Sequence, residues 1–193
     1  MSSASKTPLK RPAAPPREQT QTSQSPAVNK ISYDTQIMDV WSKNLDEEIS
    51  KISDLLEQYP YIAMDTEFPG FFGRNEGQTQ DSGYKFIKTN VDQLKLIQVG
   101  ITLADEDGNM PSPVNTWQFN LKFDLKKETH HLDSINMLKD AGIKFEYLAD
   151  HGIEPLRLAE ALISSGLVLN EDIVWVTFHG SFDFAYMLRL LIN

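Results

Sequence analysis

Cysteine is missing from this chain of 193 residues. Its absence excludes disulfide bonds, thiolate metal sites and a cysteine nucleophile, and it is typical of an intracellular protein. No apolar run approaches the roughly 20 residues that a membrane-spanning helix needs, and we expect no secretory leader. The sequence therefore predicts a protein of the cytoplasm and nucleus that has no membrane segment.

Positive charge is also scarce, since 18 Lys and Arg residues stand against 27 Asp and Glu residues and the net charge is −9. A protein that coats RNA without sequence preference usually has a basic surface, so this class is disfavoured. If the folded part of the chain meets RNA, cations must mediate part of the contact.

The first thirty residues differ from the rest in composition. They hold five prolines and five basic residues against one acidic residue, with few large apolar side chains and no periodicity. We expect a disordered, low-complexity tail over residues 1–30 and one folded domain over residues 31–193. The alternative role for the tail is a weak basic tether for RNA or a protein partner.

The hydrophobic pattern predicts an α/β protein. Apolar spacing indicates helices over residues 37–56, 134–141, 155–164 and from 181 onward, and strands over 61–68, 94–103, 116–123 and 173–178. A loop is expected over residues 70–83 and a hairpin turn over 105–109. Three strands, a helical crossover and a fourth strand begin a ribonuclease-H-like fold, although several mixed folds begin similarly.

Two carboxylates stand at the end of the first of these strands. Asp65 and Glu67 are two residues apart, so they project from one face at a separation of about 7 Å. That spacing suits Mg²⁺, which prefers oxygen ligands. The structural alternative is a strand end that meets water before the turn at Pro69 and Gly70.

A second group of polar residues follows the fourth predicted strand. Asp183 would lie in the first turn of the last helix, where the helix dipole alone favours an acid. His179 more often supports its neighbours than binds a metal or acts as a base. Combined with Asp65 and Glu67, however, Asp183 favours a site for two divalent ions, which can activate the attacking water and stabilise both the scissile phosphate and the leaving oxygen.

The chain resembles the Caf-type, or Pop-type, poly(A) deadenylases of the CCR–NOT complex, which belong to the DEDD exonuclease superfamily. The resemblance covers nearly everything after residue 36. It is carried by Val40-Trp41, residues 59–70, 90–100, 116–120 and 133–135, and the segment from Trp175 to His179.

The resemblance implies a 3′-to-5′ exoribonuclease that shortens messenger-RNA poly(A) tails and releases AMP with two divalent ions, Mg²⁺ or Mn²⁺. Asp65 and Glu67 match the first motif and Asp183 the second, so all three would be catalytic metal ligands. Phe68 and His179 would contact substrate, Phe68 through its backbone. The implied partners are poly(A) RNA, the Not scaffold subunit, the second deadenylase subunit and antiproliferative adaptor proteins.

The chain also departs from the family pattern. Gly180-Ser181 stands where the family reads Ser-Gly, and residues 71–83 match poorly. The third motif, a final aspartate preceded by a histidine, has no counterpart, and the last helix is apolar nearly all round. We therefore expect a C-terminally incomplete domain that carries three of the four metal-binding carboxylates.

Two other functions remain open. One is a catalytically silent binding module that keeps the surfaces for scaffold and adaptor proteins. The other is a DEDD nuclease that acts on structured RNA or on DNA.

Overall fold

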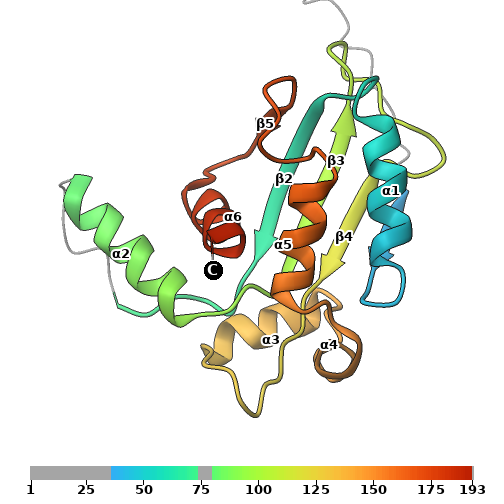
Figure 1. Cartoon of the computed structure of the whole chain (residues 1–193). Helices are drawn as coiled ribbons and strands as arrows, with labels where there is room; N and C mark the ends of the chain where they lie inside the picture. The colour runs from blue at the N-terminus through green and yellow to red at the C-terminus, as the bar shows by residue number, and fades with distance from the viewer. Residues whose placement is uncertain (1–35, 74–79, 193) are drawn as a thin grey trace, which may run out of the picture. The chain divides into compact units, whose positions relative to one another are not determined.

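Five strands form one mixed sheet in the computed structural model, which describes residues 36–73 and 80–192 (Figure 1). Strands β2 and β3 pair antiparallel, as do β3 and β4, whereas β1 runs parallel to β4 and β5 parallel to β2. In spatial order the strands are β1 (Ile37–Val40), β4 (Thr116–Asn120), β3 (Gln98–Ala104), β2 (Tyr61–Glu67) and β5 (Val174–Val176). The mixed sheet confirms the predicted α/β class.

All of the described residues belong to one compact unit. The tail predicted for residues 1–30 lies outside the described residues. Among those described, no helix is both long and apolar enough to cross a membrane.

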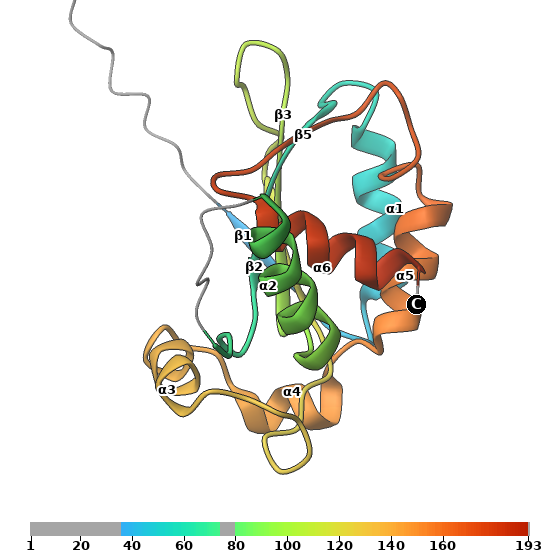
Figure 2. The ribbon, with the colours of Figure 1, turned by 90° about the vertical axis from the view of Figure 1, so that its left-hand side faces the viewer.

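Helices cover one face of the sheet and one end of it. Helices α1, α5 and α6 lie on the same face, and α3 and α4 lie beyond one end of the strands (Figure 2). No described helix covers the opposite face. The bounds are α1 (Leu45–Leu55), α2 (Gln80–Gln93), α3 (Leu132–Asp140), α4 (Phe145–His151), α5 (Pro155–Ser164) and α6 (Ser181–Ile192).

Strict alternation along the central strands separates the two faces. In β2, Ile62, Met64 and Thr66 are buried, while the residues between them are exposed or half-buried. Strands β3 and β4 alternate in the same way over most of their length. Because successive side chains of a strand point to opposite faces, the helix-covered face holds the core and the other face carries polar groups. Asp65 and Glu67 lie on this polar face.

The first predicted helix is wrong at its beginning. Residues Ile37–Val40 form strand β1, and helix α1 begins only at Leu45. The side chain of Asn44 accepts a hydrogen bond from the backbone N–H of Trp41 at 2.8 Å and donates one to the carbonyl of Asp39 at 3.1 Å. These bonds close the turn that separates strand from helix, and pairing with β4 overrides the helical spacing.

The region after β2 also differs from the prediction. Helix α2 begins at Gln80, inside the expected loop, and β3 begins at Gln98 rather than near residue 94. Residues 74–79 of that loop lie outside the described residues. The short helix α4 was not predicted, because a seven-residue helix with only Phe145 and Leu148 buried gives too little periodicity to recognise.

Most of the remaining elements agree with the sequence. Helix α5 has the predicted bounds, α3 and β5 lie within two residues of theirs, and the hairpin turn closes with the Asp105 N–H donating to the Asn109 carbonyl at 2.9 Å. Strand β4 begins at Thr116 as predicted but ends at Asn120 rather than at residue 123, because Leu121 pairs instead with Ile153 in an isolated parallel bridge. Helix α6 is apolar on both sides, as expected. It buries Tyr186, Met187 and Leu190 and exposes Phe184, Leu188 and Ile192.

The hydroxyl of Tyr186 is buried without a hydrogen-bond partner in the part of the chain that the structure describes. Only 2% of the residue is exposed, and burial raises the pKa of its hydroxyl well above the ordinary value. An unpaired buried hydroxyl costs about 1–3 kcal/mol. We expect Tyr186→Phe to leave the free energy of unfolding unchanged or to raise it by up to about 2 kcal/mol in urea denaturation. A loss of stability larger than that of Tyr84→Phe, a change at an exposed tyrosine, would reveal a hidden partner.

Candidate active site

Asp65 and Glu67 line one pocket of about 590 Å³ on the polar face of the sheet. Strands β3 and β4 form its floor, and the end of β5 forms its rim. Gly100 lies opposite Asp65 in the β2–β3 ladder and has only the Asp65 carbonyl oxygen, at 3.8 Å, near the position a side chain would take. The space beside the Asp65 carboxylate is therefore open, as expected where a ligand approaches a strand closely.

The pKa of Glu67 is raised above its ordinary value. The main cause is burial, and the negative charges of Asp65 and Asp183 add to it. Burial and like charges both disfavour the ionised carboxylate. The pocket therefore concentrates negative charge that a bound cation would neutralise.

This shift predicts a pH effect on the metal-free chain. The folded chain holds the Glu67 proton more tightly than the unfolded chain does. At a pH between the ordinary pKa of 4.5 and the raised pKa, the folded chain therefore binds more protons than the unfolded chain. Stability must then fall as pH rises from 4.5 through the raised pKa. Glu67→Gln should remove this part of the fall and make the chain more stable than wild type at neutral pH, as measured by urea denaturation in EDTA.

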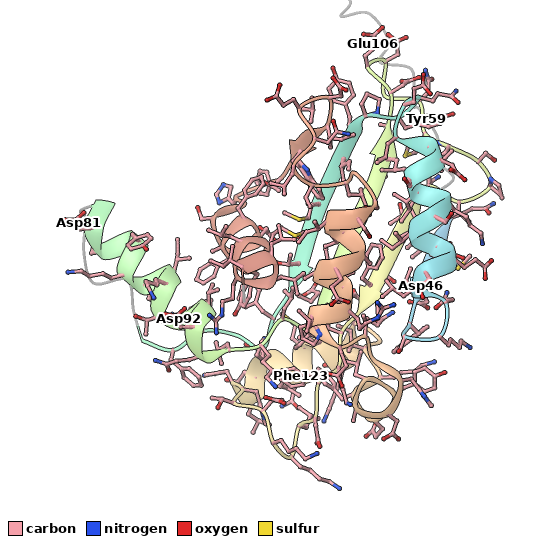
Figure 3. The ribbon with its side chains drawn as sticks, viewed as in Figure 1. Asp46, Tyr59, Asp81, Asp92, Glu106 and Phe123 are labelled. Carbon is pink, nitrogen blue, oxygen red and sulfur yellow. The ribbon has the colours of Figure 1, made fainter. Side chains whose placement is uncertain are left out.

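The matched control is Glu106→Gln, which changes an exposed acid at the tip of the β3–β4 hairpin (Figure 3). It should leave the pH dependence as in the wild type. If the free energy of unfolding changed with pH equally in the wild type, Glu67→Gln and Glu106→Gln, the raised pKa of Glu67 would not be the cause of the pH effect.

Asp183 lies near this pocket but does not line it. Asp183 is 7% exposed, and its carboxylate accepts a 2.6 Å hydrogen bond from the hydroxyl of Thr66. Thr66 stands between the two acids of β2 and points to the helix-covered face. Among the described residues, no three His, Asp or Glu side chains gather closely enough to hold a metal ion. The structure thus brings Asp65 and Glu67 together and ties Asp183 to the same strand from α6.

The two predicted substrate contacts do not line the pocket either. The ring of Phe68 packs against Phe182 and Tyr186 of α6, with centroids 5.2 and 4.9 Å apart, so it anchors that helix. His179 has a positive φ of 54° and stacks on Phe178 at 4.5 Å. The ring of Phe178, 87% exposed, lines the pocket rim instead.

The backbone at position 180 leaves no room for a side chain. A side-chain carbon at position 180 would lie 2.0 Å from Oγ1 and 2.5 Å from Cβ of Thr177. Such a carbon cannot be accommodated without moving the turn that leads into α6. Glycine at 180 therefore keeps the start of α6, and with it Asp183, in place beside Thr66.

Sequence reasoning missed three residues of this region. The sequence pattern gives Thr66 no role, yet its hydroxyl holds Asp183. The pattern places Phe178 at the end of a strand, whereas the structure places it after β5, exposed at the pocket rim. The alternation of β4 turns the half-buried Gln118 toward the pocket, but the sequence alone assigns it no function.

A sequence model described as CAF1 family ribonuclease matches residues 40–166 of the chain. The chain belongs to this family of ribonucleases. It is 47% identical over 158 residues to poly(A) ribonuclease pop2 of Schizosaccharomyces pombe, across 80% of this chain and 47% of that protein. It is 44% identical over 165 residues to the Arabidopsis thaliana protein named probable CCR4-associated factor 1 homolog 7, across 81% of this chain and 60% of that one.

Solved structures agree with these relatives. The S. pombe Pop2p structure, in an Mg²⁺- and Mn²⁺-bound form, matches with a TM-score of 0.77 at 47% identity, over 80% of this chain and 63% of that chain. Yeast CAF1 co-crystallised with the NOT1 MIF4G domain matches with a TM-score of 0.71 at 34% identity, over 82% and 59%. These matches confirm the predicted ribonuclease-H-like exonuclease fold. The chain spans about half to three fifths of the length of the curated relatives.

Proposed function

We propose that the chain is the core of a 3′-to-5′ exoribonuclease that removes adenosines from poly(A) tails and releases AMP. The observation that carries this proposal is the pair Asp65 and Glu67, which share an open pocket where burial and like charge raise the pKa of Glu67. Each ionised carboxylate disfavours the ionised form of its neighbour, and a cation bound between the two would remove this repulsion. Membership of a ribonuclease family and relatives named for poly(A) support the substrate.

The donor chemistry fits a divalent cation. Asp65, Glu67 and Asp183 offer only oxygen atoms, which suit Mg²⁺ and Mn²⁺, and a solved relative binds both ions. When bound, two such ions would activate water and stabilise the charge that develops on the phosphate and on the leaving oxygen. Asp65 and Glu67 would hold them from the strand, and Asp183 from the helix.

Other residues would position these ligands and the RNA. Thr66 fixes the Asp183 side chain through its hydroxyl, so the carboxylate cannot rotate freely. Phe178 presents an exposed ring at the pocket rim, where an unstacked base could pack against it. Phe68 and His179 are proposed as further contacts with the terminal nucleotide.

The test follows 5′-labelled RNA that ends in an oligo(A) tail, with Mg²⁺ or Mn²⁺ present. The chain is compared with Asp65→Ala and with a version extended through the third motif of the family. Stepwise shortening that Asp65→Ala abolishes supports the proposal, whether the present chain or only the extended version is active. Equal shortening of oligo(U) and oligo(C) tails would favour a nuclease of another substrate class.

A second candidate is a catalytically silent binding module. It is favoured by the absence, among the described residues, of a three-ligand metal cluster and by the bond that occupies Asp183. Its partners would be the Not scaffold, the second deadenylase subunit and antiproliferative adaptors, and a relative co-crystallised with NOT1 supports the first of these. If the chain bound the Not scaffold but neither it nor the extended version shortened oligo(A) RNA, this candidate would be favoured over the nuclease.

A further inference from the structure

A second pocket of about 400 Å³ adjoins the candidate active site on the polar face of the sheet. Glu67, Gln98 and Gln118 line both pockets, so the two are continuous. One wall is the end of β1 with Trp41. The other is the connection between α3 and α4, which ends at Lys144. We call this second pocket the amide groove. The residues used in the argument are Asp39, Trp41, Gln98, Gln118, Asn120 and Lys144.

Hydrogen bonds fix the orientation of several polar side chains in the amide groove. Gln98 Nε2 donates to Asn120 Oδ1 at 2.8 Å. Asn120 Nδ2 in turn donates to the carbonyl of Gln118 at 3.1 Å and to Asp39 Oδ1 at 3.3 Å. Asn120 is 3% exposed, so this set is shielded from water. Two side chains are thereby oriented. Gln98 Oε1 and the second carboxylate oxygen of Asp39 accept no hydrogen bond from any residue that the structure describes, so both can accept one from a ligand.

The side-chain amide of Gln118 has no hydrogen bond within the described part of the chain, although it lies at the junction of the two pockets. An amide offers both N–H donors and a carbonyl acceptor. Half-buried polar groups of this kind normally find a partner in protein or water. Gln118 lies between Asp39 of β1 and Gly100 of β3, and because Gly100 has no side chain, the amide is free to face a ligand.

The groove also has an aromatic wall and a cation. The ring of Trp41 is fixed edge-to-face against Tyr147, with centroids 4.5 Å apart, and the Trp41 backbone is tied to Asn44. A ring that cannot move is a suitable surface for stacking a base. Lys144 is exposed at the opposite wall, where a phosphate could meet it.

We propose that the amide groove binds the nucleotide next to the one in the catalytic pocket and that Gln118 recognises its base as adenine. This inference rests on the proposed function. The free acceptors of Gln98 and Asp39 match the exocyclic amino group of adenine, while the Gln118 amide can both donate to a ring nitrogen and accept from the amino group. Uracil presents a carbonyl oxygen in place of the amino group and an N–H in place of the ring nitrogen, so its carbonyl oxygen would face the acceptors of Gln98 and Asp39 and its N–H would face the donor of Gln118. The groove therefore selects against uridine at the penultimate position.

The test measures binding of fluorescein-labelled oligo(A) by anisotropy, with Ca²⁺ in place of Mg²⁺ to slow cleavage. One oligonucleotide is all adenosine, a second carries uridine at the penultimate position, and a third carries it five nucleotides upstream. Wild type should bind the penultimate-uridine RNA about 10-fold more weakly than oligo(A). In Gln118→Ala the difference should shrink to about twofold, while the upstream uridine has little effect in either protein.

Two further variants separate recognition from folding. Gln118→Glu keeps the shape of the side chain but removes its N–H donors, so it should lose the same preference. Gln58→Ala changes an exposed glutamine just after α1 and should keep the wild-type ratio. Thermal melts that coincide with wild type exclude unfolding as the cause.

The outcomes distinguish the two proposals. If wild type binds oligo(A) but tolerates penultimate uridine, or if both Gln118 variants keep the preference, the groove assignment is overturned and the proposed function stands. If wild type neither binds nor shortens oligo(A), the proposed function fails and the groove assignment falls with it.

Discussion

Replacing Asp183 with asparagine should lower the affinity of the chain for Mn²⁺ by about 100-fold or more. Asparagine can still accept the Thr66 hydrogen bond, so the fold should survive while the charge is lost. Changing a residue that only orients a metal ligand typically costs 10–100-fold in metal affinity or activity, and removing the ligand itself should cost at least as much. The measurement is calorimetric titration with Mn²⁺, followed by the rate of oligo(A) shortening.

Two comparison variants make this result specific. Thr66→Val removes the hydroxyl that positions Asp183 and keeps the carboxylate, so its affinity should fall by only about 10-fold. Glu106→Gln removes an equal charge at the hairpin tip and should change nothing. Wild-type affinity in Asp183→Asn would remove Asp183 from the metal site and leave Asp65 and Glu67 alone.

Replacing Glu48 with alanine should reduce the free energy of unfolding by about 2–4 kcal/mol. Glu48 lies on α1 but is only 3% exposed, and its Oε2 accepts the indole N–H of Trp117 at 3.0 Å. Its other oxygen accepts from Lys51 at 2.8 Å. The alanine variant leaves the Trp117 N–H unpaired in the core, a cost of about 1–3 kcal/mol, and adds the loss of packing. Urea denaturation measures the change.

Glu47 provides the matched control, because it precedes Glu48 and also pairs with Lys51, yet its side chain is 67% exposed. Glu47→Ala should cost far less stability than Glu48→Ala, because water screens an exposed ion pair. The double variant Glu48→Leu/Trp117→Phe removes both polar partners and should be less destabilised than the sum of its single changes. Equal losses for Glu47→Ala and Glu48→Ala would show that the buried bond contributes nothing.

The sequence predicts an element of the fold correctly where its local hydrophobic pattern agrees with its tertiary packing. The alternation from Tyr61 to Glu67 predicted β2 well, because each buried side chain of that strand meets the same helical layer. It failed at Ile37–Val40, where four residues form a strand only because β4 offers them a parallel partner about eighty positions along the chain. No local spacing contains that information.

The same distinction applies to the candidate site. The acids of β2 could be predicted, because alternation places both on one face. The bond between Thr66 and Asp183 could not be predicted, since it joins residues 117 positions apart, and the place of Asp183 depends on the turn at Gly180. The continuity of the amide groove with the pocket likewise follows from strand order, which brings β1, β4, β3 and β2 side by side.

The close approach of Thr177 to the backbone of residue 180 has a consequence for how this chain compares with other members of its family. In the present backbone a serine at position 180 would collide with the threonine. A chain that carries this threonine together with the order Ser-Gly must therefore enter α6 along a different backbone path. The order of the two residues thus reports which backbone path a member of the family uses at this turn.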